Sequence, residues 1–101
     1  MRRGTTPSFN FAINVDLTDA TVYVTFTQKT TVIEKTSDDL TVSPYNIEVQ
    51  LTQEDTLSFV AGKPVKAQIR YVTEDGYADA SDIYELDVED VLKDGEIVHG
   101  G

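Results

Sequence analysis

Short runs in which apolar and polar side chains alternate dominate this sequence, and they restrict the chain to a fold built from β-strands. From Val22 to Thr27 and from Val65 to Tyr71, every second residue is apolar. This period of two places the apolar side chains on one face of an extended strand, and most of the residues are types that favour strands. Five weaker runs are assigned as strands on the same grounds: 7–15, 31–33, 40–42, 47–51 and 77–88.

The segments between these runs carry signals for turns. Asp75-Gly76 predicts a tight hairpin between the last two strands, because glycine adopts the positive φ of such a turn at no cost. The residues 52–57 begin with threonine and two nearby acids, which is typical of a single helical turn, and we expect Leu57 to point inward. In the run 77–88 the apolar residues share a face with Asp82, a conflict that a one-residue bulge near Ser81 and Asp82 removes.

Seven short strands, with one helical turn between the fifth and the sixth, predict an all-β fold: an immunoglobulin-like antiparallel two-sheet sandwich. The prediction concerns the architecture alone, because the cysteine and tryptophan hallmarks of antibody domains are absent. A small barrel is the alternative. The apolar residues expected to meet in one core are Phe11, Val24, Phe26, Ile69 and Leu86.

The length of 101 residues suits one domain, and the lack of cysteine excludes disulfides and cysteine zinc sites. We assign residues 1–92 to the domain and residues 93–101, whose patterning is weak, to a flexible C-terminal tail. Nothing in the sequence resembles a signal peptide or a membrane span. We therefore expect a protein made in the cytoplasm, without a membrane partner.

The formal net charge is -10, and it is unevenly distributed. From Glu74 onward ten residues are acidic and one, Lys93, is basic, whereas residues 1–73 carry eight acids and seven bases. Nucleic acid is therefore not expected as a partner, because phosphate binding relies on lysine and arginine.

Catalytic chemistry finds no support in the sequence. His99, the single histidine, lies next to two terminal glycines, where no neighbouring residue fixes it beside a nucleophile. The carboxylates are numerous, but hydrolysis by paired acids requires two of them fixed in a cleft. We expect no enzyme activity, no cofactor and no small-molecule substrate.

Two hypotheses of ligand binding remain open as alternatives to this expectation. The run 75–82 contains Asp75, Asp79 and Asp82, whose oxygens suit calcium, although their spacing does not match an EF-hand loop. A sugar-stacking platform is the second hypothesis, and it would be built from the five tyrosines Tyr23, Tyr45, Tyr71, Tyr77 and Tyr84.

Arg2 and Arg3 allow two interpretations. They form a solvated lead-in to the first strand, or they bind the acidic C-terminal quarter of a neighbouring subunit, since opposite charges favour such contacts. In the second case the candidate assembly contacts are Arg2, Arg3, Asp79, Asp82, Glu85 and Asp87.

Several stretches together resemble a known family. They are the opening MRRGTTP, the run LTQEDTL at 51–57, the strand VKAQIRY at 65–71, Asp75-Gly76, Ala80-Ser81 and the closing LKDG at 92–95. In these features the chain resembles short prophage-borne proteins of Firmicutes, which are similar to the N-terminal sandwich domain of siphophage baseplate upper proteins.

The resemblance implies a structural protein of the virion, at the tail or baseplate, that associates with other virion proteins or with itself. It implies no catalysis, and it places the protein in the bacterial cytoplasm during synthesis and in the virion afterwards. The sequence carries no helical stalk or receptor-binding module of the baseplate protein, so direct host recognition is not expected. The alternative is a free-standing carbohydrate- or calcium-binding β-sandwich module.

Overall fold

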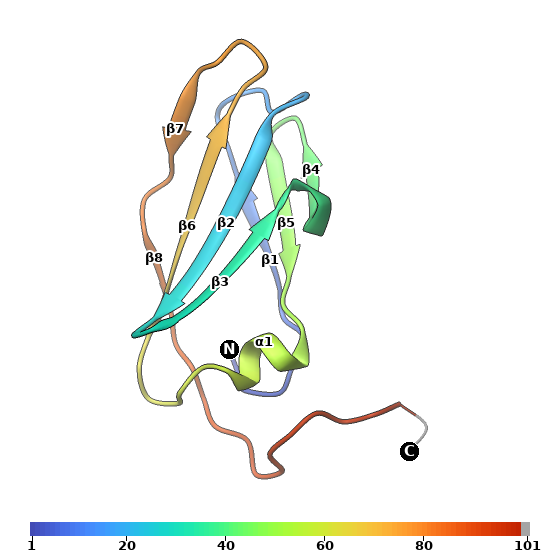
Figure 1. Cartoon of the computed structure of the whole chain (residues 1–101), viewed down its shortest axis with the longest axis vertical. Coiled ribbons are helices and arrows are strands. Elements are labelled where there is room, and N and C mark those ends of the chain that lie inside the picture. The colour runs from blue at the N-terminus through green and yellow to red at the C-terminus, as the bar shows by residue number, and fades with distance from the viewer. Residues whose placement is uncertain (100–101) are drawn as a thin grey trace.

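The computed structural model describes residues 1–99 and consists of two antiparallel sheets packed face to face (Figure 1). The smaller sheet has the strand order β1-β5-β4, and the larger has the order β3-β2-β6, with β7 and β8 both paired to β6. The elements are β1 (Ser8–Ala12), β2 (Thr21–Gln28), β3 (Thr31–Thr36), the 3-10 turn η1 (Ser37–Asp39), β4 (Leu40–Ser43), β5 (Asn46–Gln50), α1 (Gln53–Leu57), β6 (Val65–Val72), β7 (Ala78–Ala80) and β8 (Tyr84–Leu86).

The expected all-β two-sheet sandwich, with one helix between the fifth and sixth strands, is confirmed. Its strand order differs from that of immunoglobulin domains, in which the second strand lies beside the first and the fifth. Here β2 lies between β3 and β6. The likeness to immunoglobulin domains is therefore one of architecture.

The core lies between the sheets and follows from the alternation in β2 and β6. Val24, Phe26 and Ile69 are fully buried, as the sequence predicted. Phe11 and Leu86 are only partly buried and pack against the edge of this core, because each belongs to an outer strand of its sheet. Rings from the two sheets meet where Phe9 lies 6.0 Å from Phe26, centroid to centroid.

The predicted hairpin and the predicted bulge are both present at the end of the chain. Gly76 has a φ of +91°, and the Gly76 amide donates to the Thr73 carbonyl at 2.9 Å. Beyond β7, the two residues 68–69 of β6 face the three residues 81–83, so the final strand contains one extra residue. This bulge divides the seventh strand into β7 and β8, which accounts for the eight strands within residues 1–99.

The buried residue of the helix α1 is not the one that the sequence predicted. Thr52 caps it, since its side chain accepts from the Asp55 amide and the Asp55 carboxylate accepts from the Thr52 amide. Thr56, not Leu57, is the fully buried residue of the helix. Its hydroxyl donates to the Thr5 carbonyl at 2.9 Å, which satisfies a buried polar group and attaches the helix to the N-terminal segment.

Two strand boundaries also differ from the prediction. β1 ends at Ala12 instead of residue 15, because the next residues bond to the β4–β5 turn: the Ile13 amide donates to the Tyr45 carbonyl and the Leu17 amide to the Pro44 carbonyl. β3 continues to Thr36, three residues beyond the expected end, since its pairing with β2 runs to Tyr23.

Candidate assembly surfaces

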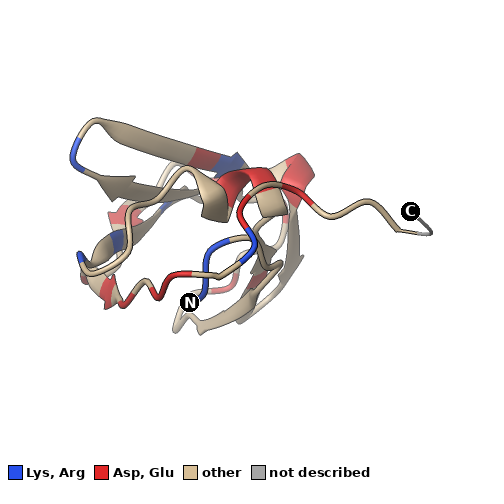
Figure 2. Cartoon of the chain, turned by 90° about the horizontal axis from the view of Figure 1, so that it is seen from below, with Lys and Arg blue, Asp and Glu red and all other residues tan. Residues whose placement is uncertain are grey.

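Arg3 is bound within its own chain. Its side chain, 19% exposed, donates to the carbonyls of Phe59 at 2.8 Å and Leu57 at 3.0 Å, at the end of α1. The same guanidinium forms ion pairs of 3.1 Å with Asp90 and Asp94. Figure 2 shows this meeting of the basic N-terminal segment with the acidic C-terminal segment. Arg3 is therefore not part of a solvated lead-in, as the first interpretation had it.

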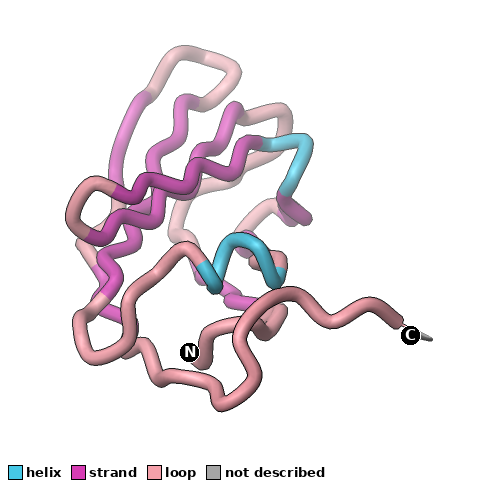
Figure 3. Tube along the Cα trace, turned by 60° about the horizontal axis from the view of Figure 1, so that its bottom comes forward, coloured by secondary structure: helices cyan, strands magenta, loops and turns pink. Residues whose placement is uncertain are grey.

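The main chain joins the same two segments. The Arg3 amide donates to the Glu89 carbonyl, the Glu89 amide donates to the Met1 carbonyl, and Arg2 forms a parallel bridge with Glu89. The N-terminal ammonium group also lies 2.9 Å from the Glu89 carboxylate, and this hydrogen bond is the largest cause that lowers the pKa of Glu89. Part of the acidic C-terminal quarter is thus neutralised inside the molecule, below α1 (Figure 3).

The remaining candidate contacts do not form one cluster. Arg2 is exposed and donates to the Asp90 carbonyl, and the carbonyl of Asp87 accepts from the N-terminal ammonium group, so these two residues lie near the chain start. Asp79 lies on β7 opposite Tyr71, and Asp82 lies in the bulge. The other residue of the set, Glu85 on β8, lies opposite Lys66.

The outer side of the larger sheet is the broadest continuous surface that the strands present. Its residues alternate with the buried ones along each strand, and their rows follow from the pairing register. We call this surface the neutral face. It comprises Thr21, Tyr23, Thr25 and Thr27 of β2, Val32, Glu34 and Thr36 of β3, Lys66, Gln68, Arg70 and Val72 of β6, and Ala78, Ala80, Ile83 and Glu85 of the final strand.

The neutral face has a formal charge of zero in a chain of net charge -10, because its two acids, Glu34 and Glu85, are balanced by the two bases Lys66 and Arg70. It also exposes large apolar side chains: Val32 is 62% exposed and Ile83 is 58% exposed. A shallow hollow of about 120 Å³ lies between β2, β6 and Ile83. Exposed aromatic and aliphatic groups gathered on one surface are typical of protein interaction sites.

Sequence reasoning missed this face, although the signal was present. The outward positions of β2 and β6 are threonine, tyrosine, glutamine, valine, lysine and arginine, without a single acid.

The aspartates of the run 75–82 are held by local donors. The Asp75 carboxylate accepts from the Thr73 hydroxyl, which is the largest cause that lowers its pKa. Asp79 accepts from the Tyr77 hydroxyl at 3.2 Å, and the hydroxyl of Ser81 donates to the main-chain carbonyl of Asp82 at 2.8 Å. Within residues 1–99, no three acidic or histidine side chains come together in a way that would hold a metal ion.

The five tyrosines do not share one surface. Tyr23 lies on the neutral face, Tyr71 is buried, and the ring of Tyr84 packs 5.3 Å from that of Phe11. Tyr45 is exposed in the turn between β4 and β5, and Tyr77 follows Gly76 in the hairpin. A stacking platform would require several rings side by side.

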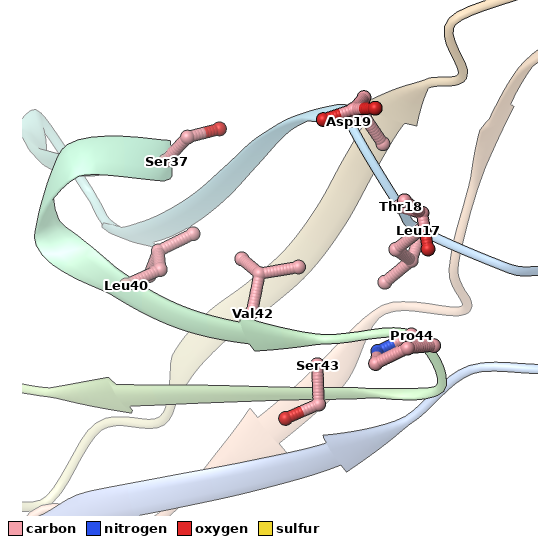
Figure 4. Close-up of a pocket in the computed structure, with 9 residues that line it drawn as sticks. Leu17, Thr18, Asp19, Ser37, Leu40, Val42, Ser43 and Pro44 are labelled. Atoms are coloured by element: carbon pink, nitrogen blue, oxygen red, sulfur yellow. The ribbon is translucent and has the colours of Figure 1, made fainter.

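A hollow of about 480 Å³ opens at the edge of the sandwich near η1 and β4 (Figure 4). Leu40 and Val42 point from β4 toward the loop that carries Leu17. The Ser37 hydroxyl at its rim is already bonded to the Val22 main chain. The lining has one carboxylate, that of Asp19, and no basic group, so it offers no paired acid and base.

His99 is exposed, at the end of the part of the chain that the structure describes. In that part, the helices are too short and too polar to traverse a bilayer.

Comparisons with protein-family models, with curated proteins and with solved structures found no match to this chain.

Proposed function

We propose that this chain is a non-enzymatic structural protein of a phage or prophage particle, a tail or baseplate component that acts through protein–protein assembly. The family resemblance of its sequence motivates the proposal. In this proposal the protein is made in the bacterial cytoplasm, and its place of action is the virion.

The observation that supports assembly is the neutral face. On a chain that carries eighteen acids, a sheet surface four strands wide holds two acids, two bases and several exposed apolar groups. Exposed apolar and aromatic groups gathered on one surface are typical of a protein interaction site, and this face exposes Val32, Ile83 and Tyr23.

Mass spectrometry of purified particles tests the proposal. Prophage particles induced from the source bacterium should contain this protein in a fixed ratio to the major tail protein, and washing at high salt should not remove it. Absence of the protein from intact particles would contradict the virion role.

A thermal shift produced by calcium or by a sugar library would favour the ligand-binding module instead, because binding stabilises the folded state.

A further inference from the structure

The neutral face has an order that the register defines. Tyr23 of β2 lies directly beside Arg70 of β6, Thr25 lies beside Gln68, and Thr27 lies beside Lys66. Both bases in the central strands therefore belong to β6, and the outward side of β2 carries hydroxyl groups only. The two acids lie on the flanking strands β3 and β8.

We propose that this face binds the same face of a second copy of the chain, with a two-fold axis that runs along the strands between β2 and β6. This inference rests on the proposed role in assembly and names the partner. Such an axis places β6 of one copy over β2 of the other. Arg70 then faces Tyr23 of the second copy, and Gln68 faces Thr25.

These contacts are chemically favourable. A guanidinium over a tyrosine ring gains a cation–π interaction, and an amide opposite a hydroxyl gains a hydrogen bond. The arrangement also keeps like charges apart, since Lys66 and Arg70 face β2, which carries no charge of its own. Glu34, on the strand next to β2, becomes a diagonal neighbour of both bases of the second copy.

Charge also favours a second copy at this face over the acid-rich loops and the C-terminal segment. Two molecules of net charge -10 repel each other, and this repulsion is smallest where the facing surfaces are neutral. The other sixteen of the eighteen acids lie in the loops, in η1 and α1, at Asp79 of β7 and in the C-terminal segment, with one, Glu48, on the smaller sheet. A face with equal numbers of acids and bases, arranged on different strands, is complementary to itself.

The size of the face sets the expected strength. A strand of eight residues is about 26 Å long and four strands are about 19 Å wide, which gives roughly 500 Å² in plan. A standard interface buries about 800 Å² on each partner. We therefore expect a weak dimer, with a dissociation constant between about 10 µM and 1 mM.

Sedimentation equilibrium of the whole chain, over a range of protein and salt concentrations, gives the first test. Dimers should form more readily as salt rises, because screening weakens the mutual repulsion of the acidic chains. The second interpretation of Arg2 and Arg3, an attraction between opposite charges of two subunits, predicts weaker association in salt. A monomer at all concentrations, or association that weakens with salt, would overturn the proposal.

The second test locates the interface. Thr25→Glu places a charge at the centre of the neutral face and should weaken dimerisation at least tenfold. Ala12→Glu adds the same charge at an exposed position of β1, on the smaller sheet, and should change the dissociation constant of the dimer by less than twofold. Thermal unfolding of both variants checks that each is folded. Equal weakening by the two variants would place the contact elsewhere.

The third test addresses the pairing of Tyr23 with Arg70. A Tyr23→Ser protein and an Arg70→Gln protein each lose both pairs in their own dimers, but a mixed dimer keeps one pair intact. Random pairing alone favours the mixed dimer over either homodimer by a factor of about two. After this factor is removed, the mixed dimer should be about twofold to fivefold tighter than either homodimer. A purely statistical mixture would exclude this two-fold axis.

The two proposals fail separately in these experiments. A chain that is present in particles but stays monomeric, or that dimerises through another surface, overturns the inference and keeps the virion role. A chain that dimerises through the neutral face but is absent from particles overturns the virion role alone.

Discussion

Ser81 and Ile69 exchange two hydrogen bonds across the bulge of the final strand. The Ser81 amide donates to the Ile69 carbonyl at 2.8 Å, and the Ser81 hydroxyl accepts from the Ile69 amide at 3.0 Å. The side chain of Ser81 thus satisfies a main-chain donor that the extra residue would otherwise leave without a partner. Since the Ile69 side chain is fully buried, this donor lies close to the core.

Ser81→Ala should destabilise the fold by about 1–3 kcal/mol, the usual cost of an unsatisfied buried donor. Ser81→Thr retains the hydroxyl and should cost less than half as much. Urea unfolding of both variants measures the difference. Equal losses for alanine and threonine would mean that the hydroxyl contributes nothing to the bulge.

Gly76 provides a test of the hairpin. Its φ of +91° is unfavourable for residues with a Cβ, although no heavy atom lies within 4 Å of the place where a Cβ would be. Gly76→Val should therefore cost about 1–2 kcal/mol through backbone strain alone. Gly76→Asn should cost less, because asparagine tolerates positive φ. If valine and asparagine give the same melting temperature, the turn has another conformation.

Phe26 tests the core. The side chain is fully buried between the sheets, so Phe26→Ala should lose about 3–5 kcal/mol of unfolding free energy. The control is Val32→Ala on the adjacent strand, where the side chain is 62% exposed and the expected change is within about 0.5 kcal/mol. A loss below about 1 kcal/mol for Phe26→Ala would contradict the observed register of β2.

The sequence allowed the strands to be found because each leaves a local trace. β2 and β6 have one buried and one exposed face, so their alternation located them to within one residue at each end. The bulge followed from the same rule, since Asp82 conflicted with the pattern. The pairing of β2 with β6 cannot be read from a local pattern, because it joins residues that are far apart in sequence, from Thr27 with Lys66 (66 − 27 = 39 positions) to Thr21 with Val72 (72 − 21 = 51 positions).

The environment of Arg3 was beyond local reasoning for the same reason. Asp90 and Asp94, its carboxylate partners, are 87 and 91 residues away in sequence. Composition alone indicated that the two ends of the chain attract, and it did not distinguish one chain from two. Thr56 is a similar case, since its burial depends on the Thr5 carbonyl and not on its own polarity.

Arg3→Met tests whether this attachment stabilises the fold. The variant keeps most of the apolar stem but loses the donors to the Leu57 and Phe59 carbonyls, and we expect a loss of about 2 kcal/mol, typical of hydrogen bonds from a charged group. Arg2→Met is the comparison variant: it loses one exposed hydrogen bond, to the Asp90 carbonyl, so its expected loss is less than half that of Arg3→Met. Identical unfolding curves for the two variants would make Arg3 a solvated residue after all.

The lowered pKa of Asp55 predicts how the free energy of unfolding depends on pH. Burial raises the pKa of this carboxyl, but hydrogen bonds from Lys35, at 2.8 Å, and from the Thr52 amide outweigh it, so the pKa is lowered. A carboxyl whose pKa is lower in the folded state stabilises the fold above its unfolded pKa of about 3.9, and this contribution disappears as pH falls through the folded pKa.

Asp55→Asn should therefore be less stable than the unmodified protein at pH 6, and the difference should shrink as pH falls from about 5 toward about 2. Asp38→Asn removes an exposed acid of η1 and should differ little from the unmodified protein at pH 6. Urea unfolding of the three proteins across this range measures both differences. A deficit of Asp55→Asn that stays constant down to pH 2 would show that the amide disturbs the cap by its shape, and that the ionised carboxylate is not what binds Lys35 and Thr52.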